Sequence, residues 1–196
     1  MTLLHSEIKE DLSLILSGLQ KEGRPVASTF EALKVSSFFP ALILSSNIIC
    51  WLMAYMLFVS NGDNTGLGLS FYAEAAMLFM SYGGWISLAV TLVIGFFFTL
   101  VFLPTSLIYV SIPKEVRGVS KITSRIVRNL RKVSIYLWLI SSALTVAGLI
   151  YGKYVLLYAF PATIFLGIFI FNGYIGIETV RYGLGPLIEK ISSFKK

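Results

Sequence analysis

The chain has 196 residues, of which 56% are hydrophobic and only 13% are charged. Charged residues make up about a quarter of a typical water-soluble domain, so this composition excludes such a domain and indicates a bundle of membrane spans. The formal net charge is +6. In a membrane protein, the first explanation for excess Lys and Arg is that they fix the orientation of the chain. Binding to nucleic acid is a less favoured explanation.

Residues suited to catalysis or metal binding are scarce. The single cysteine, Cys50, excludes an intramolecular disulfide and a thiolate metal cluster, and His5 is the only histidine. The sequence has no paired carboxylates, no Ser-His-Asp arrangement and no glycine-rich phosphate loop. We therefore predict no enzymatic activity, no metal and no cofactor.

Residues 1–37 are predicted to form an N-terminal region outside the membrane. From Leu4 to Gln20, apolar residues recur at helical spacing between charged ones, which predicts an amphipathic helix. Its apolar face would rest on the membrane or on the bundle; the alternative is docking to a partner protein. Ser28 stands three residues before Glu31, a capping-box spacing that predicts the start of a short helix.

The first span is expected at residues 38–59, with Asn47 near its middle. A buried Asn in lipid usually forms a hydrogen bond to another helix, so we interpret Asn47 as a helix-packing residue. The following outer loop offers the recognition candidates Asn61, Asp63 and Asn64. Residues 71–82 fit either an external interfacial helix or the start of the second span, and the sequence leaves both interpretations open.

The second span is expected at residues 83–110, inside a stretch without Asp, Glu, Lys or Arg. One face of this helix carries a small residue at every fourth position. In lipid, small residues at this spacing let another helix approach closely. We name this set the small-residue stripe and interpret it as a helix-packing surface; its members are Gly83, Ser87, Thr91, Gly95 and Thr99.

Residues 114–132 predict a basic amphipathic helix, because seven cations face only one acidic residue, Glu115. Such a helix usually contacts anionic lipid headgroups, and the alternative is contact with a partner protein. Nucleic acid is disfavoured because no aromatic residue alternates with the basic ones. The candidate contact residues are Lys114, Arg117, Lys121, Arg125, Arg128, Arg131 and Lys132.

The third and fourth spans are expected at residues 133–151 and 154–177, joined so tightly that they must form an antiparallel hairpin. We interpret three residues in these spans as helix-packing residues: Gly148 and Gly152, which form a GxxxG pair, and Asn172, the one strongly polar residue inside the fourth span.

A basic tail, residues 178–196, follows the fourth span. Glu178 and Arg181 are spaced so that they can pair where this helix meets water. With this arrangement, all of the 16 Lys and Arg except Lys153 lie on one side of the membrane. The positive-inside rule then predicts that both termini and the basic helix are cytoplasmic. The predicted fold is all-α: a polytopic four-helix transmembrane bundle with an N-terminal amphipathic helix and a basic cytoplasmic helix.

The break Gly23-Arg24-Pro25, the run Ser28-Thr29-Phe30-Glu31-Ala32-Leu33-Lys34 and the overall layout resemble the TraS-type entry-exclusion proteins of F-like conjugative plasmids. The local similarity covers about the first quarter of the chain, with general hydropathy beyond it. The resemblance implies a multi-pass protein of the bacterial inner membrane. It would block redundant uptake of the same plasmid by recognising the mating-pair protein TraG of the donor cell. No catalytic residue is implied.

Two further functions fit a small membrane bundle with these exposed helices and loops. One is an immunity protein against a pore-forming colicin, and the other is an accessory subunit of a larger membrane complex that the small-residue stripe would contact. The expected partners are another membrane protein, TraG-like if the resemblance holds, and anionic lipids; nucleic acid is not expected and a homo-oligomer is left open. If the function is entry exclusion, we expect the partner protein to be recognised by residues 61–70 outside the cell, or by residues 4–20 and 114–132 inside it.

Overall fold

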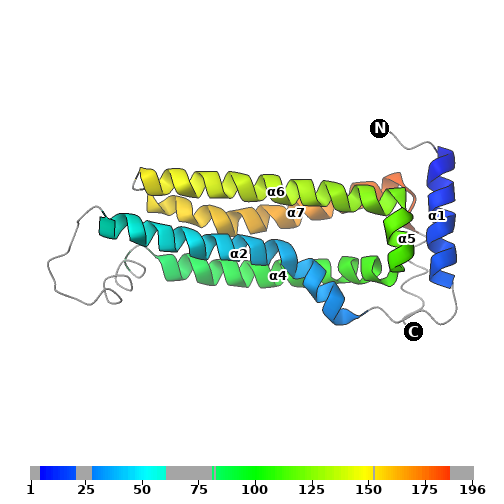
Figure 1. The fold of residues 1–196 in the computed structure, drawn as a ribbon, viewed down its shortest axis with the longest axis horizontal. Coiled ribbons are helices and arrows are strands. Elements are labelled where there is room, and N and C mark those ends of the chain that lie inside the picture. The colour runs from blue at the N-terminus through cyan, green and yellow to red at the C-terminus, as the bar shows by residue number, and fades with distance from the viewer. Residues whose placement is uncertain (1–4, 21–27, 61–80, 82, 152, 186–196) are drawn as a thin grey trace. The chain divides into compact units, whose positions relative to one another are not determined.

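The computed structural model describes residues 5–20, 28–60, 81, 83–151 and 153–185. These residues form helices joined by short turns and contain no strand, which confirms the all-α fold. Four helical segments are long and apolar enough to cross a membrane, so the chain is a multi-pass membrane protein (Figure 1). The long helices are α2 (Thr29–Ser60), α4 (Gly84–Ser111), α6 (Lys121–Ile150) and α7 (Ala159–Arg181), the last preceded by the 3-10 turn η1 (Tyr154–Tyr158).

Two short helices complete the described chain: α1 (His5–Gln20) and α5 (Lys114–Val119). The contacts divide the chain into two compact units. Unit 1 comprises residues 1–36, 99–134 and 168–196, and unit 2 comprises residues 37–98 and 135–167. Each of the four long helices therefore contributes residues to both units.

Unit 1 has an apolar core to which α1 contributes. Ile15 of α1 is 2% exposed and packs with Ile112, which follows α4. Elsewhere in this unit, the rings of Phe102 and Phe171 meet edge to face with centroids 5.8 Å apart. Aromatic pairs in this geometry gain attraction beyond the area that they bury.

Unit 2 holds the turn between α6 and α7. The backbone N–H of Lys153 donates a hydrogen bond to the carbonyl oxygen of Gly148 at 2.7 Å, which closes α6. The hydroxyl of Tyr158 donates to the carbonyl oxygen of Gly83, just before α4. Gly83 has a φ of +70°, and a Cβ there would lie 2.6 Å from the Tyr158 hydroxyl, so both the backbone and the contact require glycine.

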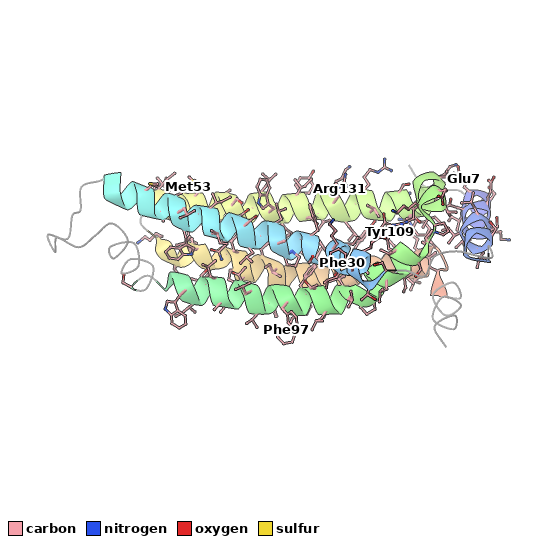
Figure 2. The ribbon with its side chains drawn as sticks, turned by 60° about the horizontal axis from the view of Figure 1, so that its bottom comes forward. Glu7, Phe30, Met53, Phe97, Tyr109 and Arg131 are labelled. Carbon is pink, nitrogen blue, oxygen red and sulfur yellow. The ribbon has the colours of Figure 1, made fainter. Side chains whose placement is uncertain are left out.

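The long helices also present large apolar side chains outward. Met53 of α2 and Phe97 of α4 project away from their helices in Figure 2, and both are exposed. Exposed apolar surface on this scale is unfavourable in water but meets lipid chains in a bilayer. The outward-facing side chains therefore agree with the assignment as membrane spans.

Two boundaries differ from the sequence-based expectation. α2 runs unbroken from Thr29, so the expected short helix and the first span are one helix, which begins where the backbone N–H of Glu31 donates to Ser28 Oγ. The basic segment, in contrast, is divided at Ser120: α5 ends there, and α6 begins at Lys121 and continues through the third span. The reason for this break lies in the contacts of Ser120 and Asp11.

Candidate functional site at the junction of α1, α5 and α6

The amphipathic helix α1 lies against α5 of the same unit (Figure 1). Ile15 and Ile112 form the buried centre of the contact. Gly18 of α1 allows the close approach, because a Cβ at this position would lie 2.7 Å from Val116 Cγ2 of α5. The apolar face of the amphipathic helix therefore rests on the chain itself. Partly buried side chains around this centre are Leu16, Ile108, Val116 and Leu184.

The carboxylate of Asp11 caps the N-terminus of α6. The backbone N–H of Ile122 donates to Asp11 Oδ2 at 2.8 Å, and that of Lys121 donates to Oδ1 at 3.1 Å. The hydroxyl of Ser120 lies 2.9 Å from Oδ2. The first N–H groups of a helix lack partners within it, and the helix dipole favours a negative charge at this end. Asp11, only 8% exposed, supplies both the acceptor oxygens and the negative charge. It therefore stabilises the start of α6.

Ser120 gives α6 a second, local cap. Its Oγ accepts a hydrogen bond from the backbone N–H of Thr123 at 3.1 Å, the usual geometry of an N-cap serine. Its own N–H donates to the carbonyl oxygen of Val116, which ends α5. The break in the basic segment therefore follows from an N-cap in the sequence, and the buried carboxylate of α1 strengthens it.

Three of the seven predicted contact cations already have partners within unit 1. Lys121 Nζ lies 3.0 Å from Glu7 Oε1, and Lys114 Nζ lies 3.8 Å from Glu31 Oε1. The guanidinium of Arg117 stacks over the ring of Tyr109, 4.9 Å from its centroid. Because the side chains of Lys114 and Lys121 remain mostly exposed, these surface ion pairs contribute little to stability and leave both cations within reach of a headgroup or a partner. Figure 2 labels Glu7 and Tyr109.

Three other exposed cations share one face of α6: Arg128, Arg131 and Lys132. Within the described chain they form no ion pair. The same face continues along the helix with the exposed apolar residues Ile135 and Tyr136. Cations one turn before lipid-facing apolar residues are typical of a membrane–water boundary. Figure 2 labels Arg131. The seventh cation, Arg125, is half-buried.

The small-residue stripe of α4 faces other helices of unit 2. The amide nitrogen of Asn47 donates to Thr91 Oγ1 at 2.9 Å and to Ser87 Oγ at 3.3 Å. Ser87 Oγ in turn donates to the carbonyl oxygen of Leu157. A polar side chain that finds partners on neighbouring helices stabilises their association in lipid. Asn47 thus links α2 to α4, and Ser87 links α4 to η1.

Gly95 continues this stripe by close packing. A Cβ there would lie 3.2 Å from Pro40 Cβ of α2 and 3.8 Å from Ile164 Cδ1 of α7. Thr99, the last member of the stripe, is also buried, although it belongs to unit 1. Gly83 accepts the hydrogen bond of Tyr158 described above. Trp138 adds a further polar link in unit 2, because its indole N–H donates to Ser46 Oγ at 2.7 Å.

The remaining predicted residues lie in different environments. Gly148 is buried against Leu156, whereas Asn172 of α7 is exposed. Gly152 and the loop candidates Asn61, Asp63 and Asn64 lie outside the described residues, as do residues 71–80 and 82, for which two interpretations were open.

Glu178, near the end of α7, forms the expected pair with Arg181, at 3.6 Å between Oε1 and Nη1. It does not face water, however, because only 5% of it is exposed. Tyr182, which follows the helix, is also buried, and this burial raises the pKa of its phenol, with the charge of Glu178 acting in the same direction. Across unit 1, the amide of Asn129 donates to the hydroxyl of Tyr174 at 2.8 Å.

Sequence reasoning missed the roles of Asp11, Ser120 and Tyr158. Ser120 left a local signal, since a serine just before a helical run favours an N-cap. Asp11 and Tyr158 left none, because their partners lie 110 and 75 residues away in the chain. Contacts of this range depend on how the helices pack.

Comparisons of the chain with models of protein families, with curated proteins and with solved structures gave no match. The fold and the junction therefore define a class: an all-helical, multi-pass membrane protein. Several of its buried and partly buried polar side chains link neighbouring helices, and its N-terminal amphipathic helix is docked on the start of α6.

Proposed function

We propose that this chain is an inner-membrane recognition protein that blocks redundant conjugative DNA uptake. It would act in the recipient cell by binding a mating-pair protein of the donor, TraG-like in kind. The resemblance of the N-terminal quarter to TraS-type entry-exclusion proteins motivates this proposal.

One observation supports recognition over transport or catalysis. The apolar parts of the four spans contain no Asp, Glu, Lys, Arg or His. Proton- and ion-coupled carriers usually have an ionisable group in the middle of the membrane. Instead, the buried amide of Asn47 on α2 donates hydrogen bonds to Ser87 and Thr91 on α4. Side chains used in this way stabilise a scaffold, and recognition is left to the surfaces at the two membrane faces.

The charge distribution sets the proposed orientation. With Lys153 as the only cation on its side, the positive-inside rule places both termini in the cytoplasm. The junction of α1, α5 and α6 is then cytoplasmic. By the same rule, residues 61–70 would be outside the cytoplasm, where a donor protein would first arrive.

The proposal is tested by expressing the chain in recipient cells and measuring transfer of a cognate conjugative plasmid. We expect the transfer frequency to fall by orders of magnitude, while transfer of a plasmid from an unrelated exclusion group stays unchanged. Unchanged transfer of every plasmid tested would contradict the proposal. Survival against a pore-forming colicin, measured in the same strains, would instead identify an immunity protein.

Specificity is then located by exchanging segments between relatives that exclude different plasmids. Because Asp11 of α1 is bonded to the start of α6, residues 4–20 and 114–132 have to be exchanged together. Residues 61–70 form the second exchange. We expect one of the two exchanges to transfer specificity. Unchanged specificity after both would place recognition within the bilayer.

A further inference from the structure

Three cations of α6 lie beside the place where this helix meets α7 in unit 1. Asn129 marks that side of α6, because its amide donates to the hydroxyl of Tyr174 on α7 at 2.8 Å. Lys132 follows Asn129 by three positions and Arg125 precedes it by four, so both lie one turn away on the same side of the helix. Arg128 lies one turn from each of these two cations. We call Arg125, Arg128 and Lys132 the cationic strip.

The cationic strip offers positive charge to a ligand from outside. Arg128 and Lys132 are exposed and form no ion pair within the described chain. Arg125 is half-buried, and its charge reaches the end of α7: burial raises the pKa of the Tyr182 phenol, and the charge of Arg125 opposes this rise. The carboxylate of Glu178 on α7 is buried and already paired, so it does not neutralise the strip.

Outward-facing apolar side chains border the cationic strip on one side. Along α6, the exposed residues change from cations to Ile135 and Tyr136 within one turn after Lys132. On α7, Ile170 lies one turn from Tyr174 and is also exposed. Positive charge next to lipid-facing apolar surface is complementary to a molecule with an anionic head and an apolar tail. Inorganic phosphate and acidic peptides match only the charge.

We propose that the cationic strip binds the phosphate of one anionic phospholipid of the adjacent leaflet, with the acyl chains beside Ile170. Arg and Lys are the usual donors to phosphate oxygens. Arg125 and Lys132 lie about 10 Å apart along the helix axis, a distance that long side chains can span around one headgroup. Binding therefore saturates at one lipid, in contrast to the general attraction between a basic helix and a charged membrane. The proposal is independent of the exclusion proposal.

Arg131 provides a matched control for this site. It is exposed, and it is the neighbour of Lys132 in the chain, so the two cations lie at nearly the same depth. Arg131 is two positions from Asn129, however, which places it about 160° around the helix from the side that meets α7. A lipid attracted only by charge at the membrane boundary depends equally on Arg131 and Lys132. A lipid bound at the cationic strip depends on Lys132 alone of these two.

The test titrates the purified protein, in micelles of an uncharged detergent, with phosphatidylglycerol or phosphatidylcholine. Native mass spectrometry counts the lipids bound. We expect one phosphatidylglycerol to bind at least about tenfold more tightly than phosphatidylcholine. Lys132→Gln should weaken this binding about fivefold and Arg128→Gln/Lys132→Gln about 25-fold, whereas Arg131→Gln should change it by less than about twofold. The thermal midpoint without lipid, measured for each variant, shows that it is folded.

Two competitors separate a lipid from other anions. Inorganic phosphate and an oligoglutamate peptide, each at the concentration of the lipid, should leave the bound phosphatidylglycerol in place, because neither has acyl chains. Displacement by inorganic phosphate would show a site for free phosphate, and displacement by the peptide would show a site for an acidic protein segment. Either result would overturn the assignment to a lipid.

Three results of the titration would also overturn the proposal. The first is an equal loss of affinity in Lys132→Gln and Arg131→Gln, because this would reduce the effect to net charge. The second is phosphatidylcholine that binds as tightly as phosphatidylglycerol. The third is binding of phosphatidylglycerol that does not saturate at one lipid.

Discussion

The Asp11 carboxylate and the backbone N–H of Ile122 form a hydrogen bond of 2.8 Å between residues 111 positions apart. This bond makes the docked α1 helix the N-terminal cap of α6. It links a segment near the chain terminus to a helix that crosses the membrane. Any change that releases α1 should therefore loosen the first turn of α6.

Asp11→Ala should destabilise the protein and free the start of α6. The substitution leaves the N–H groups of Lys121 and Ile122 without their acceptor, at a cost of about 1 to 3 kcal/mol in the free energy of unfolding. Hydrogen exchange at these two amides should accelerate. Glu10→Ala is the control, because Glu10 is an exposed acid on the same helix. Equal exchange rates in the two variants would show that the cap does not hold in the membrane.

Gly148→Ala should destabilise the turn between α6 and α7. The added Cβ would lie 2.6 Å from Leu156 Cβ and 2.9 Å from the carbonyl oxygen of Lys153. Neither atom can move away alone, so we expect a loss of about 1 to 3 kcal/mol, seen as a lower midpoint of thermal unfolding in detergent. Gly118→Ala, where a Cβ meets nothing within 4 Å, should leave the midpoint unchanged or raise it. The same midpoint for both variants would argue against this packing.

Gly95→Leu should separate α4 from α2 and α7 within unit 2. The side chain would extend toward Pro40 and Ile164, which already lie close to the position of its Cβ. We expect a lower thermal midpoint, and a smaller decrease for Gly95→Ala. Val93→Leu enlarges an exposed residue of the same helix and should have little effect. Wild-type stability of Gly95→Leu would mean that this part of the small-residue stripe meets lipid.

Asn47→Ala and Thr91→Val should show energetic coupling. The hydrogen bond between these side chains, at 2.9 Å, is lost in either variant, so the double variant should be less destabilised than the sum of the two. We expect a coupling energy of about 0.6 to 1.7 kcal/mol from a double-mutant cycle. Asn47→Ala combined with Leu92→Ala, an exposed neighbour of Thr91, should be additive.

The sequence predicted the four membrane-crossing helices because a span leaves a long uncharged signal that does not depend on the rest of the fold. It also identified Ser87, Thr91 and Gly95 as neighbours on one helical face, since the four-residue spacing is local. The partners of these residues could not be predicted, because Asn47, Pro40 and Ile164 come from other helices.

In the basic segment, in contrast, the local sequence pattern gave the wrong helix boundaries. Its cations and apolar residues follow one helical period on both sides of Ser120, so periodicity alone predicted a single helix over residues 114–132. The break combines a local N-cap, Ser120, with a carboxylate from α1 that arrives only when the chain has folded. The same docking uses Lys121 for a contact with Glu7, which hydropathy patterns do not reveal.

We expect four helices to cross the membrane and to leave the junction of α1, α5 and α6 on the cytoplasmic side. The most direct measurement is a topology map with reporters fused after Ser70, Gly118, Lys153 and Lys196. We predict external reporters after Ser70 and Lys153, and cytoplasmic reporters after Gly118 and Lys196. A cytoplasmic reporter after Ser70 would contradict the four-span arrangement.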